Sequence, residues 1–395
     1  MQDSKGYLWF ATADGLNKYD GYSFTVYRNN PRNPHSLSDD WVTSICEDQA
    51  GSLWIGTSKG VLNRFDRKNE RFTHYNLCAP STLLSLKAKT PVELPFIFSF
   101  FIDQTVTTIF ADSRGASNTL WIGTLNCGLY RLVLDSTASS HADGGLQTQE
   151  NNNNLKIDKT IFQVTHYQHD PATPHSLSDN HIRAIHRDLA GALWIGTLEG
   201  GLNRFDETAG KFIHYKRDPA DANSLSNNRV LAIYEDRAGV LWIGTLGGGL
   251  NKLVAATNSG RNETAIRSRA HFVHYRHDPS NSHSLSDDDV SAIIEDDYGT
   301  LWVGTFGGGL NKLDRAAGRF AHFKHDRFNP HSLGDNDVLA IGADRIGILW
   351  IGSQLGVGIN KLDRRKEKFA HYKSDPTNLH SLSDDVVWSI YSPAS

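Results

Sequence analysis

The sequence contains few cysteines, which stabilise small secreted domains through disulfides, and no long apolar run of the kind that anchors proteins in membranes. It has three cysteines, Cys46, Cys78 and Cys127, and none lies in a CxxC motif. This odd number without paired spacing argues against a disulfide framework and a zinc site, so we expect three unpaired thiols. The longest apolar stretch, residues 95–102, is far shorter than the run of about 18 that could span a bilayer.

The chain also lacks a large excess of either charge, since it contains 40 Lys and Arg and 44 Asp and Glu. Without a basic stripe, nucleic acid is not expected as a partner. The amino terminus, residues 1–6, has neither the apolar region of a signal peptide nor a lipidation motif. We therefore expect either a cytoplasmic protein or a piece of a longer chain.

A Leu-Trp pair that returns seven times is the most informative feature present. It lies in versions of Leu-Trp-Ile-Gly-Thr, as at residues 193–197 and 241–245, with a base period of 45 to 48 residues. Periods of this size are typical of arrays in which each repeat is one supersecondary unit. The seven tryptophans are Trp9, Trp54, Trp121, Trp194, Trp242, Trp302 and Trp350.

Each repeat reads as four short strands. In one repeat these are residues 181–188, 193–197, 201–206 and 212–216, which are rich in β-branched and aromatic residues and end at Gly, Asp or Asn turns. No helical period separates them, so parallel βαβ units are excluded. The predicted fold class is all-β, a seven-bladed β-propeller of four-stranded antiparallel blades.

The two ends of the chain predict how the ring closes. The first repeat begins at its second strand, whereas residues 381–390 match the inner-strand sequence of residues 36–45 almost residue for residue. We expect this carboxyl-terminal strand to complete blade 1, which would remove exposed sheet edges.

We therefore predict one propeller domain over residues 1–395 with three insertions. Residues 134–159 are expected to be disordered and residues 255–269 to form a similar excursion. The apolar insert at residues 77–101 is expected to pack on the ring in preference to a partner. The predicted blades are 7–27 plus 386–391, 41–76, 105–169, 181–217, 229–277, 289–325 and 337–374.

The repeat also predicts roles for its own residues. Each tryptophan should fill the space between blades, and the glycine two residues later should leave room for a neighbouring ring. The Glu-Asp-x-x-Gly turns, as at residues 235–239, should be tightened by aspartate hydrogen bonds to the backbone.

The consensus resembles the two-component regulator propeller repeat. The resemblance rests on Leu-Trp-Ile-Gly-Thr, Gly-Gly-Leu-Asn-Arg-Phe-Asp and Ser-Leu-Ser-Asp-Asn, and on an opening, residues 2–21, that is similar to a first blade. It implies a bacterial, extracytoplasmic or periplasmic sensor of hybrid histidine kinases that often responds to glycan fragments. It also implies a kinase output module that this chain lacks. No ligand residue can be carried over, because no motif fixes one.

Candidate ligand residues lie where the loops enter the inner strands, at a channel mouth. The repeat keeps Asp or Asn there, at Asp40, Asn180, Asn228, Asp288, Asn336 and Asp385. The next position varies: Trp41, Thr105, His181, Arg229, Asp289, Asp337 and Val386. Variation on a uniform scaffold is where specificity could be encoded.

Two further residues break the pattern of the inner strands. Arg183 and Trp388 replace Thr, Leu, Ser or Val at a shared position. Trp41 and Trp388 would either stack on a ligand or pack between blades 1 and 2, and the polar residues suit either a ligand or a water-filled channel. The predicted ligand-binding set is Trp41, Asn180, His181, Arg183, Asn228, Arg229, Asp289, Asp337 and Trp388.

No catalytic residue, metal site or cofactor is expected. Residues 56–60 fit GxSxG but fall in a strand hairpin rather than a strand-to-helix elbow. The histidines repeat around the ring, so they cannot converge on one metal. The repeated outer-strand positions are His74, His166, His214, His274, His322 and His371.

Three hypotheses for the function remain. The first is a non-catalytic sensor of a small-molecule or oligosaccharide ligand. The second is a polysaccharide lyase or hydrolase that uses rim His and Asp or Glu residues. The third is a protein-interaction scaffold that uses the apolar residues 95–101.

Overall fold

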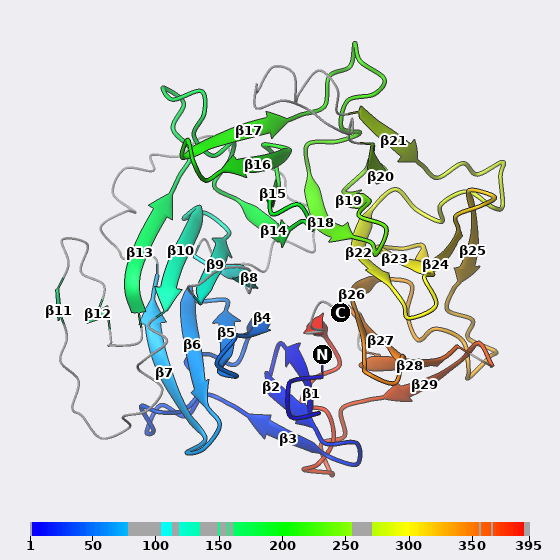
Figure 1. Cartoon of the computed structure of the whole chain (residues 1–395). Coiled ribbons are helices and arrows are strands. Elements are labelled where there is room, and N and C mark those ends of the chain that lie inside the picture. The colour runs from blue at the N-terminus through cyan, green and yellow to red at the C-terminus, as the bar shows by residue number, and fades with distance from the viewer. Residues whose placement is uncertain are drawn as a thin grey trace.

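The fold is a closed ring of seven four-stranded antiparallel sheets around a central axis (Figure 1). The computed structural model describes residues 2–77, 104–112, 118–134, 149–150, 156–157, 161–254, 271–354, 357–364 and 366–390. Within these ranges there is no helix, and so none that is long and apolar enough to cross a membrane. The predicted seven-bladed propeller is confirmed.

The first three blades lie as follows. Blade 1 contains β1 (Leu8–Thr12), β2 (Gly15–Tyr19), β3 (Phe24–Tyr27) and β30 (Val387–Ile390). Blade 2 contains β4 (Val42–Glu47), β5 (Leu53–Thr57), β6 (Val61–Asp66) and β7 (Arg71–Asn76). Blade 3 contains β8 (Val106–Asp112), β9 (Thr119–Thr124), β10 (Leu129–Leu134) and β13 (Ile161–Tyr167).

Blades 4 to 7 follow in order around the ring. Blade 4 contains β14 (Ile182–Arg187), β15 (Leu193–Thr197), β16 (Leu202–Asp206) and β17 (Lys211–Tyr215). Blade 5 contains β18 (Val230–Glu235), β19 (Leu241–Thr245), β20 (Gly249–Val254) and β21 (His271–Tyr275). Blade 6 contains β22 (Val290–Glu295), β23 (Leu301–Thr305), β24 (Gly309–Asp314) and β25 (Arg319–Phe323). Blade 7 contains β26 (Val338–Ala343), β27 (Leu349–Ser353), β28 (Ile359–Asp363) and β29 (Lys368–Tyr372).

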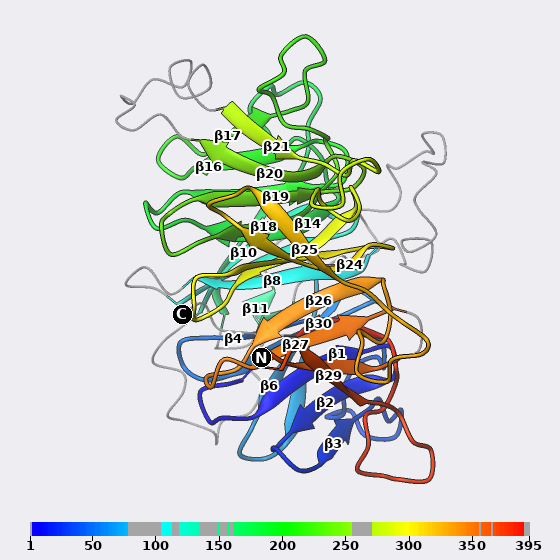
Figure 2. The same ribbon diagram turned by 90° about the vertical axis from the view of Figure 1, so that its right-hand side faces the viewer.

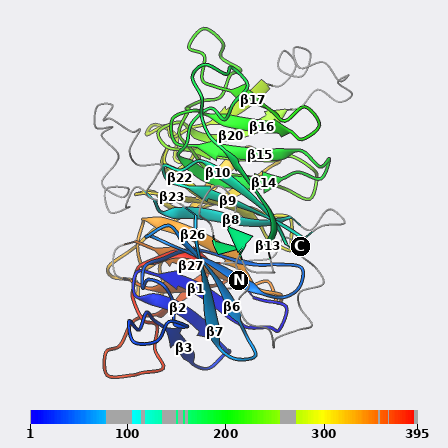
Figure 3. The same cartoon turned by 90° about the vertical axis from the view of Figure 1, so that its left-hand side faces the viewer.

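The Leu-Trp tryptophans fill the spaces between blades, as the sequence predicts. Trp242 of blade 5 is 2% exposed and packs in one cluster with Leu285 of the linker and with Val290 and Phe320 of blade 6. Trp350 of blade 7 packs in the same way against the first blade. Seen from the side, the ring extends from the blue strands of blade 1 at the bottom to the green strands of blade 4 at the top (Figures 2 and 3).

The glycine of Leu-Trp-Ile-Gly-Thr makes room for an aliphatic side chain of the next blade, not for an aromatic ring. A Cβ atom added at Gly244 would lie 2.6 Å from a methyl carbon of Val290, and one at Gly304 would lie 2.5 Å from Val338. Such distances are far below van der Waals contact, so the inner strand of the next blade fits closely only against glycine. The expectation of a neighbouring ring is thus wrong at this position.

The aspartate of the turn after the inner strand binds the backbone, as predicted, and also the tryptophan. Asp236 Oδ1 accepts hydrogen bonds from the amides of Ala238 (3.0 Å) and Val240 (2.9 Å). Its Oδ2 accepts one from Trp242 Nε1 at 2.8 Å. The same indole–carboxylate bond, 2.7–3.0 Å long, joins Trp9 to Asp3, Trp54 to Asp48, Trp194 to Asp188, Trp302 to Asp296 and Trp350 to Asp344.

Blade 3 lacks this bond. Its Trp121 is buried, and its Nε1 has no acceptor in the part of the chain that the structure describes. In other blades an arginine of the following blade also reaches the carboxylate: Arg67 contacts Asp3, Arg315 contacts Asp236 and Arg364 contacts Asp296, at 2.5–3.0 Å. The turn aspartate therefore connects the tryptophan, the turn backbone and the neighbouring blade.

The ring closes as predicted. Strand β30 pairs antiparallel with β1, with Ile390 opposite Phe10, and completes the first sheet. The loop before β30 is fixed by Asn17, whose Oδ1 accepts a hydrogen bond from the amide of Ser383 at 2.9 Å and whose Nδ2 donates to Ser383 Oγ at 2.7 Å.

Residues 77–101 lie outside the described residues except for the buried Leu77, and 255–269 lie wholly outside them. Within residues 134–159 a two-stranded sheet of β11 (Gln149–Glu150) and β12 (Lys156–Ile157) is described.

Cys46 is a buried thiol. Cys127, however, forms a disulfide, so the prediction of three unpaired thiols is wrong. Its partner is not among the described residues.

Removing residues 381–395 should sharply lower the melting temperature. The deletion takes away β30 and the buried side chains of Leu382, Val387 and Ile390. Burial of each such side chain contributes about 1.5–3 kcal/mol, so the combined loss approaches the entire stability of a typical domain. Differential scanning calorimetry measures the change.

Removal of residues 391–395 alone is the matched control, because it leaves β30 in place. This shorter deletion should melt close to the full chain. Equal melting temperatures for the long deletion and the full chain would contradict closure by β30.

Candidate functional site

The variable residues before the inner strands lie at one end of the ring, around its axis, which we call the mouth. Leu198, in the loop between the second and third strands of blade 4, donates its amide hydrogen to the carbonyl of His181 at 3.0 Å. The same bond occurs in blades 5 and 6, from Leu246 to Arg229 and from Phe306 to Asp289. In blades 2, 3 and 7 it links Ser58 to Trp41, Leu125 to Thr105 and Gln354 to Asp337. The two sets of loops therefore meet at one end of the channel, as predicted.

The Asp or Asn just before each variable residue supports the rim. Asn180 Oδ1 accepts a hydrogen bond from the amide of His169, and Asn228 Oδ1 accepts one from the amide of Arg217, both at 2.7 Å. Asp40, Asp288, Asn336 and Asp385 make the matching bond in their own loops. These bonds fix the linker between blades. Ligand contact by Asn180 and Asn228 stays a prediction.

His181 is held by a carboxylate. Its Nδ1 lies 2.7 Å from Oδ1 of Asp179, whose Oδ2 accepts a hydrogen bond from the amide of Glu199 at 3.0 Å. Burial opposes ionisation of Asp179, but the hydrogen bonds from His181 and the backbone outweigh it, so its pKa lies below the usual range. The pair fixes the ring orientation of a histidine that is 27% exposed at the mouth.

Arg183 occupies a β-bulge at the start of β14. The pairing register of β14 with β15 shifts between Ile182 and Ala184, and the other inner strands have the same bulge. In three of them the bulged residue is Thr or Ser. Its hydroxyl donates a hydrogen bond of 2.5 Å to the carbonyl of the first residue in the inner strand of the next blade. These bonds join Thr43 to Val106, Thr107 to Ile182 and Ser291 to Val338.

The bulge therefore places Arg183 beside the start of β18, the strand that follows Arg229. Burial lowers the pKa of Arg183 to about 10, which still leaves the guanidinium charged at neutral pH. The two arginines make the part of the mouth over blades 4 and 5 cationic, and the His181 ring lies beside them.

The opposite part of the mouth is acidic. Asp289 and Asp337 accept hydrogen bonds from the amides of Gly247 and Gly307 in the preceding blades, both at 2.6 Å. Burial and neighbouring aspartates, including Asp287, raise the pKa values of both carboxyls. Burial also raises the pKa of Asp384 at the start of blade 1. Carboxyls over blades 6, 7 and 1 thus share a crowded negative field.

Trp41 and Trp388 lie together at the mouth. Their ring centroids are 5.7 Å apart with an interplanar angle of 33°. Trp41 precedes the inner strand of blade 2, and Trp388 is the bulged residue of β30 in blade 1. The rings therefore pack against each other across the junction of blades 1 and 2, and each keeps part of its surface exposed.

An apolar arc at the mouth was missed by the sequence reasoning. Leu125, Leu198, Leu231 and Leu246 form one buried cluster, with Phe306 packed against it. The signal was present in the residue after Leu-Trp-Ile-Gly-Thr, which is Leu in blades 3 to 5 and Phe in blade 6. The matching residues Ser58 and Gln354 in blades 2 and 7 are polar. The mouth is thus apolar, cationic and acidic in different sectors.

The repeated outer-strand histidines have a structural role. Each uses Nε2 to bond a backbone carbonyl, mostly that of a serine in the linker before its blade, as in His214 with Ser176 at 2.7 Å. His74, His166, His274, His322 and His371 make comparable bonds of 2.5–3.0 Å. Among the described residues, no group of three or more His, Cys, Asp or Glu is arranged to hold a metal ion.

Comparisons with known proteins agree with the fold and the repeat. The family model of the two-component regulator propeller matches residues 36–59, 224–247 and 284–307, which contain the inner and Leu-Trp strands of blades 2, 5 and 6. The chain is therefore a closed propeller in which three repeats match the two-component regulator propeller model.

One curated relative is a kinase. Histidine kinase P4 of Formosa agariphila is 57% identical over 37 residues, which cover 9% of this chain and 3% of that kinase. The match thus spans a small fraction of the relative's length.

Solved structures share the fold at low identity. Virginiamycin B lyase from Staphylococcus aureus is 15% identical with a TM-score of 0.53, and the match covers 85% of this chain and 84% of the lyase. The extracellular domain of a putative one-component system from B. thetaiotaomicron is 22% identical with a TM-score of 0.48, over 95% of this chain and 43% of that chain. At 15% identity the likeness to the lyase extends to the fold alone.

Two aspartates with opposite pKa shifts should respond oppositely to neutralisation. Asp296 is buried, yet hydrogen bonds from Trp302, Thr300 and Arg364 lower its pKa, so its charge stabilises the fold above the unfolded pKa of about 3.9. Asp296→Asn should lower the free energy of unfolding at pH 7 by about 2 kcal/mol. The loss should shrink as the pH falls through the folded pKa, where the wild type loses the same stabilisation.

Asp337→Asn is the matched comparison at the mouth. Because its pKa is raised, the charged carboxylate destabilises the fold at pH 7, and neutralisation should raise the free energy of unfolding. Water screens this half-exposed group, so the gain should be roughly 0.5 kcal/mol and should vanish below the unfolded pKa. Urea unfolding at pH 7 and pH 3 measures both variants. Changes of the same sign at pH 7 would contradict the assignment.

Proposed function

We propose that this chain is a non-catalytic ligand-binding sensor propeller that recognises a polar ligand, such as a glycan, at the channel mouth. One observation carries the proposal: the mouth is divided into cationic, acidic, aromatic and apolar sectors, although the blades beneath it repeat closely. A uniform scaffold needs no such division for its stability. A ligand with several different groups would be oriented by it.

Each sector supplies a different kind of contact. His181, Arg183 and Arg229 would bind hydroxyl or acidic groups of the ligand, and Asp289 and Asp337 would accept hydrogen bonds from its hydroxyl or amino groups. The Trp41 and Trp388 rings offer a flat apolar surface of the kind that sugar rings stack on.

The family and a relative support a signalling role. Propellers with these repeats resemble the sensing part of hybrid histidine kinases, and the relative from Formosa agariphila is a histidine kinase. We infer that a kinase module acts as the output partner. The disulfide of Cys127 fits an oxidising compartment, and therefore an extracytoplasmic or periplasmic site.

Isothermal titration calorimetry with panels of neutral, acidic and amino oligosaccharides would test ligand binding. We expect at least one class to bind saturably. Arg229→Gln should weaken that binding about tenfold or more, since a hydrogen bond to a charged group contributes about 1.5–3 kcal/mol. Arg217→Gln, on the exposed linker between blades 4 and 5, is the control and should change little.

Absence of binding across all three panels would count against the proposal. Binding that Arg229→Gln and Trp388→Ala leave unchanged would show that the ligand lies elsewhere on the ring.

One observation favours a polysaccharide-active enzyme as the second candidate. The 2.7 Å contact of His181 Nδ1 with Asp179 orients the imidazole as in many general bases, and the carboxyls of Asp289 and Asp337 have raised pKa values that suit a general acid. Under this candidate, polysaccharide chain cleavage should be measurable, and His181→Ala should reduce it at least 100-fold. No cleavage by the wild type over a broad substrate panel would eliminate it.

A further inference from the structure

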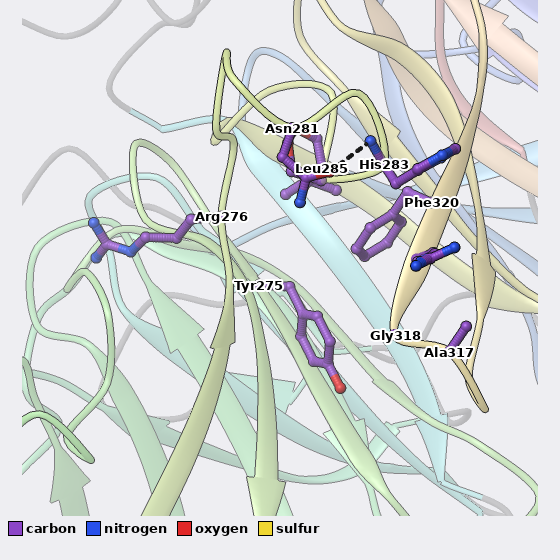
Figure 4. A pocket seen from close by; sticks show the side chains of 10 residues that line it. Tyr275, Arg276, Asn281, His283, Leu285, Ala317, Gly318 and Phe320 are labelled. Atoms are coloured by element: carbon purple, nitrogen blue, oxygen red, sulfur yellow. Dashed lines mark hydrogen bonds between the residues drawn. The ribbon is translucent and has the colours of Figure 1, made fainter.

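A pocket of about 370 Å³ lies between the outer strands of blades 5 and 6, away from the central mouth. Tyr275 at the end of β21 and Phe320 in β25 face it, with Leu285 and His283 from the linker between the blades (Figure 4). The volume lies within the usual range for small-molecule sites, about 300–1,000 Å³. Ten residues line the pocket, and none of them is an aspartate or glutamate.

The hydroxyl of Tyr275 distinguishes this blade junction from others. At the junction of blades 1 and 2, the matching Tyr27 donates its hydroxyl hydrogen to Oε1 of Glu70 at 2.9 Å. At the junction of blades 3 and 4, the matching Tyr167 is hydrogen-bonded to Arg131. The Tyr275 hydroxyl has no hydrogen-bond partner among the described residues, and burial alone raises its pKa.

Gly318 explains why the pocket is open. It stands two residues before Phe320, as Glu70 stands two residues before Phe72 in blade 2. The backbone is alike at the two positions, with φ of 63° at Gly318 and 52° at Glu70. A Cβ atom added at Gly318 would meet nothing within 4 Å. At blades 5 and 6, glycine thus leaves open the space that the Glu70 carboxylate occupies at blades 1 and 2.

The charges around the pocket suit an anion. Arg319 lines it directly, and Lys252 lies over the Trp242 ring of the same junction with its Nζ 5.7 Å from the ring centroid. Lys252 stands at the position of Arg131, the residue that reaches Tyr167 in blade 3. Arg276, in contrast, points away from the pocket (Figure 4), and its guanidinium contacts the carbonyl of Ser226 at 3.4 Å.

We propose that this pocket is a second ligand site, which binds a small organic acid whose carboxylate takes the place that Glu70 occupies at the junction of blades 1 and 2. The carboxylate accepts the hydrogen bond of Tyr275 and lies in the field of Arg319 and Lys252. An attached ring or short chain packs beside the half-buried Tyr275 ring, because Phe320 and Leu285 are buried beneath it. The site goes beyond the proposed function of the mouth and does not depend on it.

Benzoate and its uncharged counterpart benzamide are suitable probes, because they share a ring that fits the pocket and differ in charge. Titration followed by NMR should show saturable binding of benzoate and at least tenfold weaker binding of benzamide. Tyr275→Phe should weaken benzoate binding about tenfold, since it removes the donor and keeps the ring. Gly318→Glu should abolish the binding, because the new carboxylate closes on Tyr275 as Glu70 closes on Tyr27.

Gly210→Glu is the matched control, because Gly210 holds the same turn position with φ of 63° at the junction of blades 3 and 4. It should leave benzoate binding unchanged. The double variant Arg183→Gln with Arg229→Gln removes the cations of the mouth and should also leave it unchanged.

Three results would overturn the proposal. The first is no saturable benzoate binding by the wild type up to tens of millimolar. The second is equal binding of benzoate and benzamide. The third is binding that survives Gly318→Glu or disappears in the double mouth variant. If Gly318→Glu does not fold, Tyr275→Phe decides, and unchanged affinity in that variant would equally overturn the site.

Discussion

The burial of the Leu-Trp tryptophans between blades is the constraint on which the ring depends. A buried tryptophan contributes about 4–6 kcal/mol through its apolar surface, but its N–H would cost energy if left without a partner. Asp236 accepts the hydrogen bond of the Trp242 indole and one from a backbone amide of its own turn. It also forms an ion pair with Arg315 of the next blade. One carboxylate thereby satisfies a ring, a hairpin and a blade junction. Five further blades repeat the indole bond, and Asp3 and Asp296 also receive an arginine.

Because the repeat already stabilises the blades, the loops at the mouth are free to differ. The bulge at the start of each inner strand illustrates this: Thr43, Thr107 and Ser291 use it to bond the next blade, whereas Arg183 and Trp388 bring a charge and a ring to the same position. The outer junctions differ in the same manner, with Glu70 closing one and Gly318 leaving another open. Candidate sites are thus departures from the repeat at positions where its geometry is fixed.

The sequence was sufficient to predict what repetition reveals. Seven Leu-Trp pairs predicted seven blades, and the orphan copy of the inner strand predicted the pairing of β30 with β1. Contacts between blades could not be obtained this way, because spacing along one repeat does not show which side chain faces it from the next. The fit of Gly244 against Val290 and the apolar arc of Leu125, Leu198, Leu231 and Leu246 were therefore missed. The indole–carboxylate bond lies within one repeat and was missed because the turn aspartate was expected to bind the backbone alone. The disulfide of Cys127 escaped for a related reason: an odd cysteine count does not exclude one bridge.

The closure of the ring by β30 has a mechanical meaning. This strand carries Trp388, which packs on Trp41 at the mouth, and it is anchored to blade 1 by Ile390 opposite Phe10. Tension applied to the chain beyond Ile390 would act first on β30, and so on the indole pair two residues away. Conversely, a ligand that shifts Trp388 would pull on that same strand. The pairing of β30 with β1 thus closes the propeller and also gives the shortest connection along the chain between its mouth and any segment joined after Ile390.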